Sequence, residues 1–325
     1  MKVIRYLNGI TDAIREEMER DSRVILIGED VGKPGGSFGA SRGLIDQFGP
    51  ERVIDTPISE AGFVGMAAGA AACGLRRIVE IMFMDFMTLC MDGIVNQIAK
   101  MRYMYGNQFS VPIVIRMPCG GGLNAGPQHS QCLEVLLAHI PGLKVVMPST
   151  PYSVKGILKS AIRDDNPVVV VENKALHSLK GEIPEEEYLI PIGTGEIIKP
   201  GADVTIVATS RMVHEALKAA TTLTKDNIDV EVIDLISINP WDKSLVFKSI
   251  AKTHKLVIAH EAVKNFGSGA EIAAAVAEEI MDELDAPIMR IGAPFVPVPF
   301  GLESTYLPND KDIIKSVQNI YRKGF

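Results

Sequence analysis

The sequence contains little cysteine and almost no tryptophan. One Trp and four Cys occur among 325 residues, and Cys73, Cys90, Cys119 and Cys132 form neither a CxxC pair nor a zinc-type spacing. The pattern favours neither a disulfide framework nor a zinc site. It fits reduced thiols in a cytoplasmic protein, and we expect these four side chains to fill the core.

An excess of positive charge is also missing. The 33 Lys and Arg against 40 Asp and Glu give a formal net charge of −7. A general nucleic-acid binder or a protein of the membrane surface needs a basic face, so the charge balance argues against both.

Long apolar runs are absent as well. The most apolar stretch, residues 61–75, is mostly Ala and Gly and is shorter than the roughly 20 residues that a membrane span needs. Arg76 and Arg77 follow it directly, so we expect a buried helix. The N-terminal segment has no apolar core and no cleavage site of the kind that a signal peptide carries, and no such signal is expected.

The common phosphate and hydrolase motifs do not occur. There is no GxxxxGK[ST], no HExxH and no GxSxG. Residues 267–272 read GSGAEI, with Ile272 where a dinucleotide fingerprint has its third glycine. A nicotinamide oxidoreductase that uses this segment is therefore a weak hypothesis, and close packing of a glycine-capped helix is favoured.

The patterns that are present indicate an α/β protein. With 47% hydrophobic and 22% charged residues the composition is globular, and the length suggests roughly two domains. Runs of Val and Ile alternate with helical segments, which is typical of parallel sheets covered on both faces. We expect two parallel-sheet α/β domains, over 1–180 and 203–325, joined by a turn-rich linker over 181–202. A long helix is expected over 85–105.

The segment TPISEAG at 56–62 offers a candidate acid–base group. Ser59 is placed to cap a helix, and Glu60 then lies in the first turn, where the helix dipole favours a carboxylate. Simple capping is one interpretation. The other follows from the small apolar residues behind Glu60, which would desolvate the carboxyl, raise its pKa and let it exchange a proton.

A second candidate is His129, in the glycine-rich loop that begins at Gly120 after an expected strand. Ligands of open parallel sheets bind at the carboxyl ends of the strands, so His129 is a candidate acid or base there. A surface histidine without a role is the alternative. Met82 and Phe86 belong to a third segment, at a strand-to-helix junction, which fits either core packing or an apolar wall for a flat ring.

Taken together, these segments resemble one family over essentially the whole chain. The matching motifs are TPISEAG at 56–62, FMDF at 83–86, AGPQHSQ at 125–131, HIPGLKVVMPSTP at 139–151, AIRDDNPVVVVENK at 161–174 and GSGAEI at 267–272. The sequence is similar to beta subunits of the thiamine-diphosphate-dependent first component of 2-oxo acid dehydrogenase complexes, which include pyruvate, branched-chain 2-oxo acid and acetoin dehydrogenases.

The resemblance implies a transketolase-like pyrimidine-binding domain followed by a transketolase C-terminal domain. It implies that Glu60 hydrogen-bonds the aminopyrimidine ring of thiamine diphosphate and exchanges a proton with it. Met82 and Phe86 match positions that line the pyrimidine pocket. His129 matches the active-site histidine that handles protons or orients the lipoyl acceptor. A scaffold protein that has lost its chemistry is the competing hypothesis, and the presence of both Glu60 and His129 argues against it.

The resemblance also implies further ligands and partners. The GDG…NN motif that binds magnesium and the diphosphate is absent, as expected if an alpha subunit carries it in a tetramer of two alpha and two beta chains. The complex would include a dihydrolipoyl acyltransferase core. Many members bind potassium through main-chain oxygens, at positions that correspond to Ile113, Ala161, Ile162, Asp164 and Asn166.

Two features concern specificity. Phe295 stands where relatives usually have Asp, and the segment after Phe300 is shortened, which affects the surface that holds the acyltransferase; we expect no effect on the catalytic positions. The segments 100–106 and 122–134 look most like acetoin dehydrogenase beta chains. Acetoin is therefore the first expected substrate, and pyruvate or another 2-oxo acid the second.

Overall fold

The computed structural model describes residues 1–323, which divide into two compact units. The first consists of Met1–Cys119 and Leu136–Ile192. The second consists of Gly120–Val135 and the chain from Gly193 onward. The glycine-rich loop that carries His129 thus belongs to the second unit, although the strand before it belongs to the first.

The first unit is built around a parallel sheet with helices on both faces. Its strands are β1 (Lys2–Arg5), β2 (Val24–Gly28), β3 (Val53–Asp55), β4 (Arg76–Glu80), β5 (Ile113–Cys119), β6 (Lys144–Val146), β7 (Val168–Asn173) and β8 (Lys180–Ile183). Its helices are α1 (Tyr6–Arg20), α2 (Leu44–Phe48), α3 (Glu60–Ala72), α4 (Met101–Met104), α5 (Glu134–Ala138, which begins in the second unit) and α6 (Pro151–Arg163).

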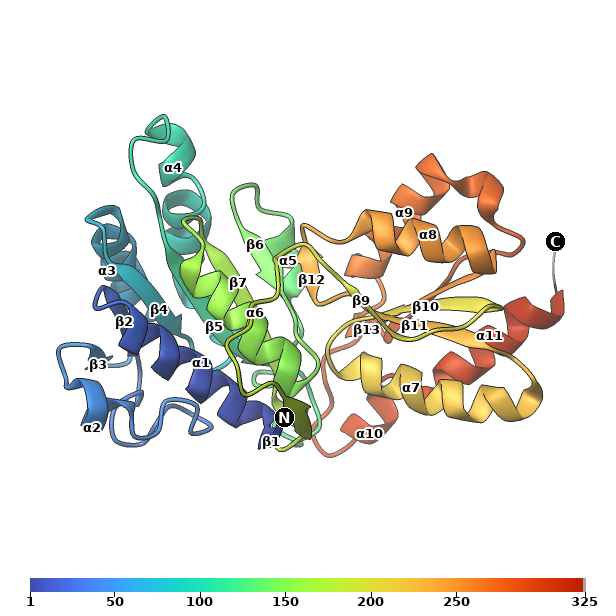
Figure 1. The fold of residues 1–325 in the computed structure, drawn as a ribbon, viewed down its shortest axis with the longest axis horizontal. Coiled ribbons are helices and arrows are strands. Elements are labelled where there is room, and N and C mark those ends of the chain that lie inside the picture. Colours follow the sequence, from blue (N-terminus) through green and yellow to red (C-terminus); the bar gives the residue numbers. More distant parts are fainter. Residues whose placement is uncertain (324–325) are drawn as a thin grey trace. The chain divides into compact units, whose positions relative to one another are not determined.

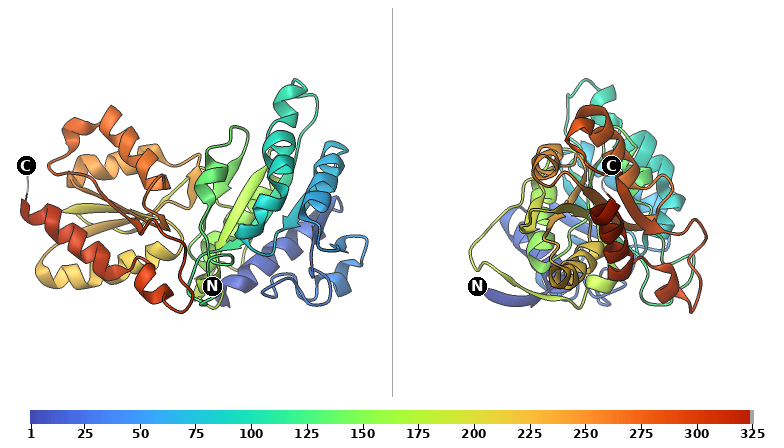
Figure 2. Two further views of the ribbon diagram at one scale, coloured as in Figure 1. Left: turned by 180° about the vertical axis from the view of Figure 1, so that it is seen from behind. Right: turned by 90° about the vertical axis from the view of Figure 1, so that its right-hand side faces the viewer.

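Six of these strands lie side by side in the order β6-β7-β5-β4-β2-β3, all parallel. Helices α1 and α6 pack together over one face (Figure 1). Helix α3 and the segment 84–104 lie over the other, which the reverse view shows (Figure 2). Every residue of β5 and β7 is buried, which explains their nearly unbroken apolar sequences.

The second unit repeats this architecture on a smaller scale. Its strands are β9 (Glu196–Lys199), β10 (Val204–Ala208), β11 (Val230–Asp234), β12 (Ser237–Asn239), β13 (Leu256–Val263) and β14 (Met289–Ala293). Its helices are α7 (Arg211–Leu223), α8 (Lys243–Thr253), α9 (Ser268–Glu279), α10 (Glu303–Tyr306) and α11 (Asp310–Lys323).

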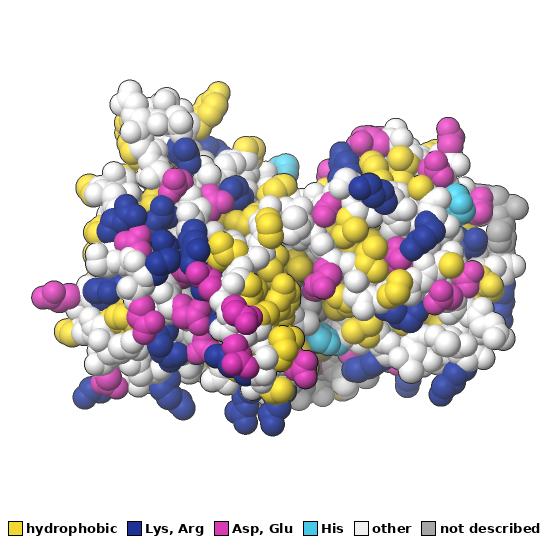
Figure 3. Space-filling model, in the orientation of Figure 1, with side chains coloured by type: hydrophobic (Ala, Val, Ile, Leu, Met, Phe, Trp, Pro, Cys, Tyr) yellow, Lys and Arg dark blue, Asp and Glu magenta, His cyan; other side chains and the backbone are white. Residues whose placement is uncertain are grey.

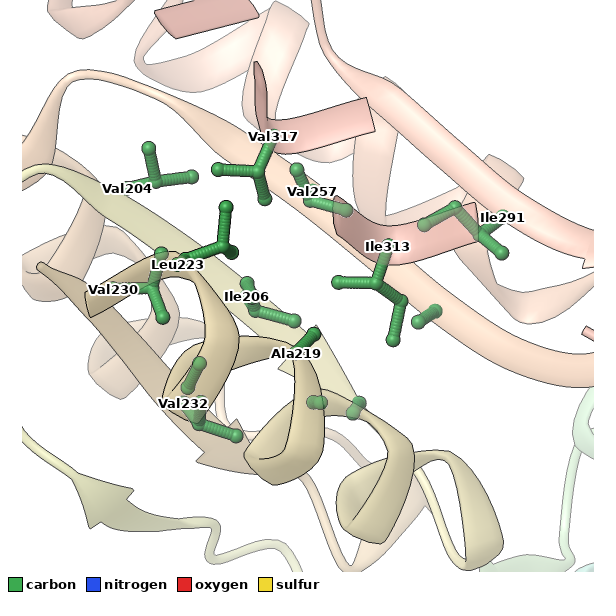
Figure 4. Close-up of a cluster of buried hydrophobic side chains, with 14 of the residues drawn as sticks. Val204, Ile206, Ala219, Leu223, Val230, Val232, Val257, Ile291, Ile313 and Val317 are labelled. Carbon is green, nitrogen blue, oxygen red and sulfur yellow. The ribbon is translucent and has the colours of Figure 1, made fainter. Parts of the chain in front are cut away.

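Five of its strands form a sheet in the order β14-β13-β10-β11-β9, in which only β9 is antiparallel. Helices α7 and α11 cover one face and α8 and α9 the other (Figure 1). Figure 4 shows the core on the first of these faces, where Ile206 and Val257 of the sheet meet Leu223 of α7 and Ile313 and Val317 of α11. The two α/β units confirm the expected fold class.

Three local expectations differ from the structure. The helix expected over 85–105 is a 3-10 turn over Met84–Cys90, a π-helical stretch over Gly93–Ile98 and the single turn α4. A Cβ on Gly93 would lie 3.3 Å from Val64 of α3, so the π-helical stretch packs closely on that helix. The segment 181–202 contains most of β8, which pairs with β1, and all of β9. Of the cysteines, Cys73 is exposed rather than part of the core.

The surface carries both signs of charge. Figure 3 shows Lys and Arg mixed with Asp and Glu over the face of the first unit that α1 and α6 cover. Lys155 and Lys159 of α6 pair there with Glu16 of α1. Within residues 1–323, none of the helices combines the length and the apolar character that a membrane span requires.

A buried arginine joins the three central strands of the first unit. Arg116 of β5, 1% exposed, donates to Glu80 of β4 at 2.6 Å and to Glu172 of β7 at 2.7 and 2.9 Å. Burial opposes the charge of Arg116, but Glu172 and Glu80 together raise its pKa above the ordinary arginine value. Burial raises the pKa of Glu80, against the attraction of Arg116. The arginine therefore stays charged and neutralises buried carboxylate.

Replacement of this arginine should be severely destabilising. In Arg116→Met two buried carboxyls lose their shared cation, and we expect a loss of about 3–5 kcal/mol in the free energy of unfolding. Urea denaturation followed by circular dichroism measures it. Lys218→Met removes an exposed cation from α7 and should cost less than about 1 kcal/mol. Equal losses in the two variants would contradict a special role for Arg116.

Candidate active site

Glu60 opens α3 and is buried. It is the first residue of the helix, and its side chain is only 5% exposed. Ser59 precedes it but does not cap the helix with its hydroxyl, which instead donates to the Pro57 carbonyl at 3.4 Å. The expected side-chain cap is therefore wrong. The helix start presents a buried carboxyl where the helix dipole favours negative charge.

A second carboxyl, which the sequence patterns did not single out, lies beside Glu60. Glu29 follows β2, is 4% exposed and accepts a hydrogen bond from the backbone N–H of Ser59. Burial and the charge of Glu60 raise the pKa of Glu29, against that hydrogen bond. Its Oε1 and the buried Thr56 Oγ1 have no hydrogen-bond partner within the described chain. The start of α3 thus has unused polar atoms for a ligand. A carboxyl directly after a buried strand was the only available sequence signal for Glu29.

The segment with Met82 and Phe86 packs close to the same helix. Met82 and Phe86 are half-buried, and the 3-10 turn Met84–Cys90 packs against α3. Burial and then the charge of Glu60 raise the pKa of the Cys90 thiol to about 12, which places this turn within electrostatic reach of Glu60. The Phe86 ring meets that of Phe83 edge to face, with the ring centres 5.6 Å apart. The structure therefore brings the carboxyl and the aromatic segment together.

His129 lies in the second unit. It is half-buried, and its backbone N–H donates to the Gly126 carbonyl at 3.3 Å. The loop around it is attached to the C-terminal segment, since Glu303 accepts hydrogen bonds from Gly122, Asn124, Ala125 and Ser130. A Cβ on Gly126 would lie 3.6 Å from Phe300. The segment from Phe300 onward therefore contacts the loop that carries His129.

A cavity of about 340 Å³ lies beside this loop within the second unit. Its walls come mainly from residues 130–133, 261–263 and 295–298, and its surface is predominantly apolar. Glu134, directly after the first of these segments, is 1% exposed. Burial, opposed by its own backbone hydrogen bond, and the charge of Glu261 raise the pKa of Glu134 to about 7. This carboxyl therefore changes charge near neutral pH.

The expected potassium positions surround the end of α6. Ala161 and Ile162 belong to its last turn, Asp164 follows it, Asn166 lies just beyond, and Ile113 begins β5. The last carbonyls of a helix favour cations. Arg76 already donates to the carbonyls of Ile162 and Asp164, at 3.1 Å each. A carbonyl oxygen has two lone pairs, so these oxygens can accept both an N–H and a cation.

The glycines of GSGAEI have a packing role. Gly267 precedes α9, and a Cβ at this position would lie 2.3 Å from the ring of His260. His260 is 1% exposed, and burial lowers its pKa to about 4. The glycine-rich turn therefore makes room for a neutral buried imidazole, which agrees with the packing interpretation of this segment.

Known domain families match both units of the chain. The transketolase pyrimidine-binding domain matches residues 2–178, and the transketolase C-terminal domain matches residues 193–313. A solved structure described as a split-gene transketolase, inactive beta4 tetramer, superposes with a TM-score of 0.82 over 99% of both chains. At 24% identity this likeness concerns the fold alone.

Relatives of three kinds are similar over nearly the whole chain. The 2-oxoisovalerate dehydrogenase subunit beta of Bacillus subtilis is 45% identical over 91% of both chains. The pyruvate dehydrogenase E1 component subunit beta of Porphyra purpurea is 46% identical over 98% of this chain and 97% of its own. The acetoin:2,6-dichlorophenolindophenol oxidoreductase subunit beta of Bacillus subtilis is 45% identical over 96% of both. The chain belongs to this family of dehydrogenase beta subunits, with transketolase pyrimidine-binding and C-terminal domains.

Proposed function

We propose that this chain is the catalytic beta subunit of a thiamine-diphosphate-dependent dehydrogenase component. The observation that carries the proposal is the buried Glu60 at the start of α3, with Glu29 beside it and the Met82–Phe86 segment packed nearby. The unused polar atoms of Glu29 and Thr56 fit a polar heterocycle bound there. The component cleaves acetoin or decarboxylates a 2-oxo acid, and passes the acyl group to the lipoyl group of an acyltransferase.

Each residue has a definite part in this proposal. When bound, thiamine diphosphate supplies a nucleophilic carbon and an electron sink for cleavage next to a carbonyl. Glu60 holds and exchanges a proton at its carboxylate, toward the aminopyrimidine ring. Met82 and Phe86 provide an apolar wall that orients the ring and excludes water. His129 handles a proton or orients the lipoyl acceptor. A scaffold protein without chemistry would need none of these groups.

Loss of the Glu60 carboxylate tests this assignment directly. Glu60→Gln keeps the size of the side chain but removes the proton-exchanging group, and we expect turnover of the enzyme reconstituted with its alpha subunit to fall about 10²- to 10⁴-fold. Ser59→Ala is the matched control, because the exposed Ser59 hydroxyl does not cap α3. Near-normal turnover of Glu60→Gln, with its heteromer intact, would overturn the role of Glu60.

The substrate is proposed to be acetoin, with pyruvate or a branched-chain 2-oxo acid as the alternative. The support is the acetoin-type appearance of residues 100–106 and 122–134, since relatives of the three kinds are equally similar to this chain. With its partner subunit, the enzyme should therefore show a higher kcat/KM for acetoin than for pyruvate. Steady-state kinetics with both substrates and one lipoyl acceptor measure the two kcat/KM values. A higher kcat/KM for pyruvate would contradict acetoin as the substrate and favour the 2-oxo acid.

Several ligands and partners belong to the same proposal. We propose that an alpha subunit with the GDG…NN motif holds magnesium and the diphosphate, in a tetramer of two alpha and two beta chains bound to a dihydrolipoyl acyltransferase core. Potassium is proposed at the main-chain oxygens of Ile113, Ala161, Ile162, Asp164 and Asn166. Those of Ile162 and Asp164 already accept from Arg76 and would use their remaining lone pair. The domains are proposed to span 1–180 and 203–325. A cytoplasmic location is proposed from the cysteine pattern.

An exposed face of α3, formed largely by glycines, supports the proposed alpha–beta interface. Gly62, Gly65 and Gly69 are exposed, and a Cβ at Gly65 or Gly69 would meet nothing within 4 Å. Met66, on the same helix, is 51% exposed. Helix α3 is thus buried on one face only, which corrects the expectation of a fully buried helix. Small residues permit the close approach of another chain to this face.

This interface predicts how the chain assembles. The isolated chain should not bind thiamine diphosphate with magnesium tightly, because it supplies only part of the contacts while the full ordering cost remains. Gly65→Leu should leave its fold intact but weaken binding of the alpha subunit, whereas Thr221→Leu on the exposed face of α7 should not. Isothermal titration calorimetry measures the binding of the cofactor and the binding of the alpha subunit. Repeating the titrations in potassium and in sodium salts tests the proposed potassium site. Micromolar cofactor binding with turnover by this chain alone would contradict the model of assembly.

A further inference from the structure

The loop that carries His129 turns its backbone amides toward one buried carboxylate. Glu303 at the start of α10 is 2% exposed. Its Oε2 accepts from the N–H groups of Gly122 at 2.5 Å and Asn124 at 2.9 Å. Its Oε1 accepts from the N–H of Ala125 at 3.2 Å and from the hydroxyl of Ser130 at 3.0 Å. The four donors lie on both sides of His129 in the sequence.

The loop backbone is shaped for this anion. Gly122 has a φ of 101° and Asn124 a φ of 53°, and such left-handed residues turn nearby amides into one concave surface. Burial works to raise the pKa of Glu303, but the amides of Asn124 and Gly122, the Ser130 hydroxyl and the Ala125 amide hold it below the usual range. The carboxylate is therefore ionised at neutral pH and stabilised by loop dipoles.

A second carboxylate fixes the start of the same loop. Glu261 of β13 accepts from the N–H of Gly121 at 2.8 Å, and its other oxygen accepts from the guanidinium of Arg211 at 2.5 Å. Leu307 packs on Gly121, where an added Cβ would lie 3.0 Å away. Glu261 thus holds the base of the loop, whereas Glu303 holds the part that leads to His129 and the residue directly after it.

We propose that Glu303 is a positioning residue for His129, which fixes the orientation of the histidine through the loop backbone and Ser130. This inference rests on the function proposed above, in which His129 serves transfer to the lipoyl acceptor. It makes the C-terminal segment around Glu303 a support of the loop that carries His129.

Hydrogen exchange measured by mass spectrometry, on the beta chain and on its complex with the alpha subunit, tests the anchor without any activity. In Glu303→Ala the amides of Gly122, Asn124 and Ala125 lose their acceptor, and we expect their exchange to accelerate at least tenfold while α7 stays protected. Glu279→Ala, an exposed acid on α9, is the control that should change nothing in the loop. Unchanged loop exchange in Glu303→Ala would overturn the proposal.

Milder variants guard against a failure to fold. In Glu303→Gln the amide oxygen can still accept the hydrogen bonds from the N–H groups of Gly122 and Asn124. The new NH₂ group can donate to Ser130 once the Ser130 hydroxyl rotates, so only the N–H of Ala125 loses its acceptor. Loop exchange should therefore rise less than in Glu303→Ala. Ser130→Ala removes one donor from the same carboxylate, so in the Glu303→Ala background it should add little to loop exchange. Fully additive effects of Ser130→Ala and Glu303→Ala would contradict the shared anchor.

Kinetics then separate a positioning role from a structural one. Glu303→Ala should lower the rate of lipoyl acylation at least tenfold. It should lower the rate measured with an artificial electron acceptor by a smaller factor. If Glu303 acts through His129, the double variant Glu303→Ala/His129→Ala should be no slower than His129→Ala alone, whereas multiplied losses would overturn the proposal. A different outcome is that His129→Ala has normal activity while Glu303→Ala shows faster hydrogen exchange in the loop. That outcome would refute the proposed function of His129, and with it the positioning role of Glu303.

Discussion

The buried ion network of Arg116 is the constraint on which the first unit depends. It joins β4, β5 and β7 near their carboxyl ends, and Glu80 is the last residue of β4, two residues before Met82. Glu80 also accepts a hydrogen bond from the backbone of Ser37, and a Cβ on Gly36 would lie 2.1 Å from its carboxylate. The same network therefore holds the glycine-rich loop after β2 and the segment that begins near Met82. The candidate site around Glu60 depends on these buried charges.

Buried carboxylates that accept backbone amides recur throughout the chain. Glu80 receives the amide of Ser37, Glu29 that of Ser59, Glu261 that of Gly121, and Glu303 three amides at once. Each bond ties a loop or a helix start to another segment. A carboxylate suits this purpose, because it offers several acceptor positions and its bonds to N–H groups are stronger than those of neutral acceptors. In this way, segments that form no regular strand or helix hydrogen bonds are still held in place.

Sequence patterns predicted the fold well where a local pattern reflects burial. Continuous Val runs such as Val168–Val171 predict β7, because a strand buried on both faces needs apolar residues at every position. They failed over 85–105, where the sequence is helical in character but the chain forms a 3-10 turn, a π-helical stretch and a single α-helical turn. Glu60 and His129 stood out by local context. Glu303 did not, because its partners Gly122 and Asn124 are 181 and 179 residues away in the sequence.

Helix α3 links the chemistry proposed for this chain to its assembly. Glu60 is its first residue and Gly62 its third, so at about 1.5 Å of rise per residue the bare glycine face begins within one turn of the carboxylate. A chain that packs along Gly62, Gly65 and Gly69 therefore comes close to Glu60 and to Glu29 Oε1 and Thr56 Oγ1, which lack a hydrogen-bond partner within residues 1–323. Burial by that partner would strengthen every electrostatic interaction of the two carboxyls, because water is removed from around them. The small residues on the exposed face of α3 thus allow the proposed partner to approach the carboxyls closely.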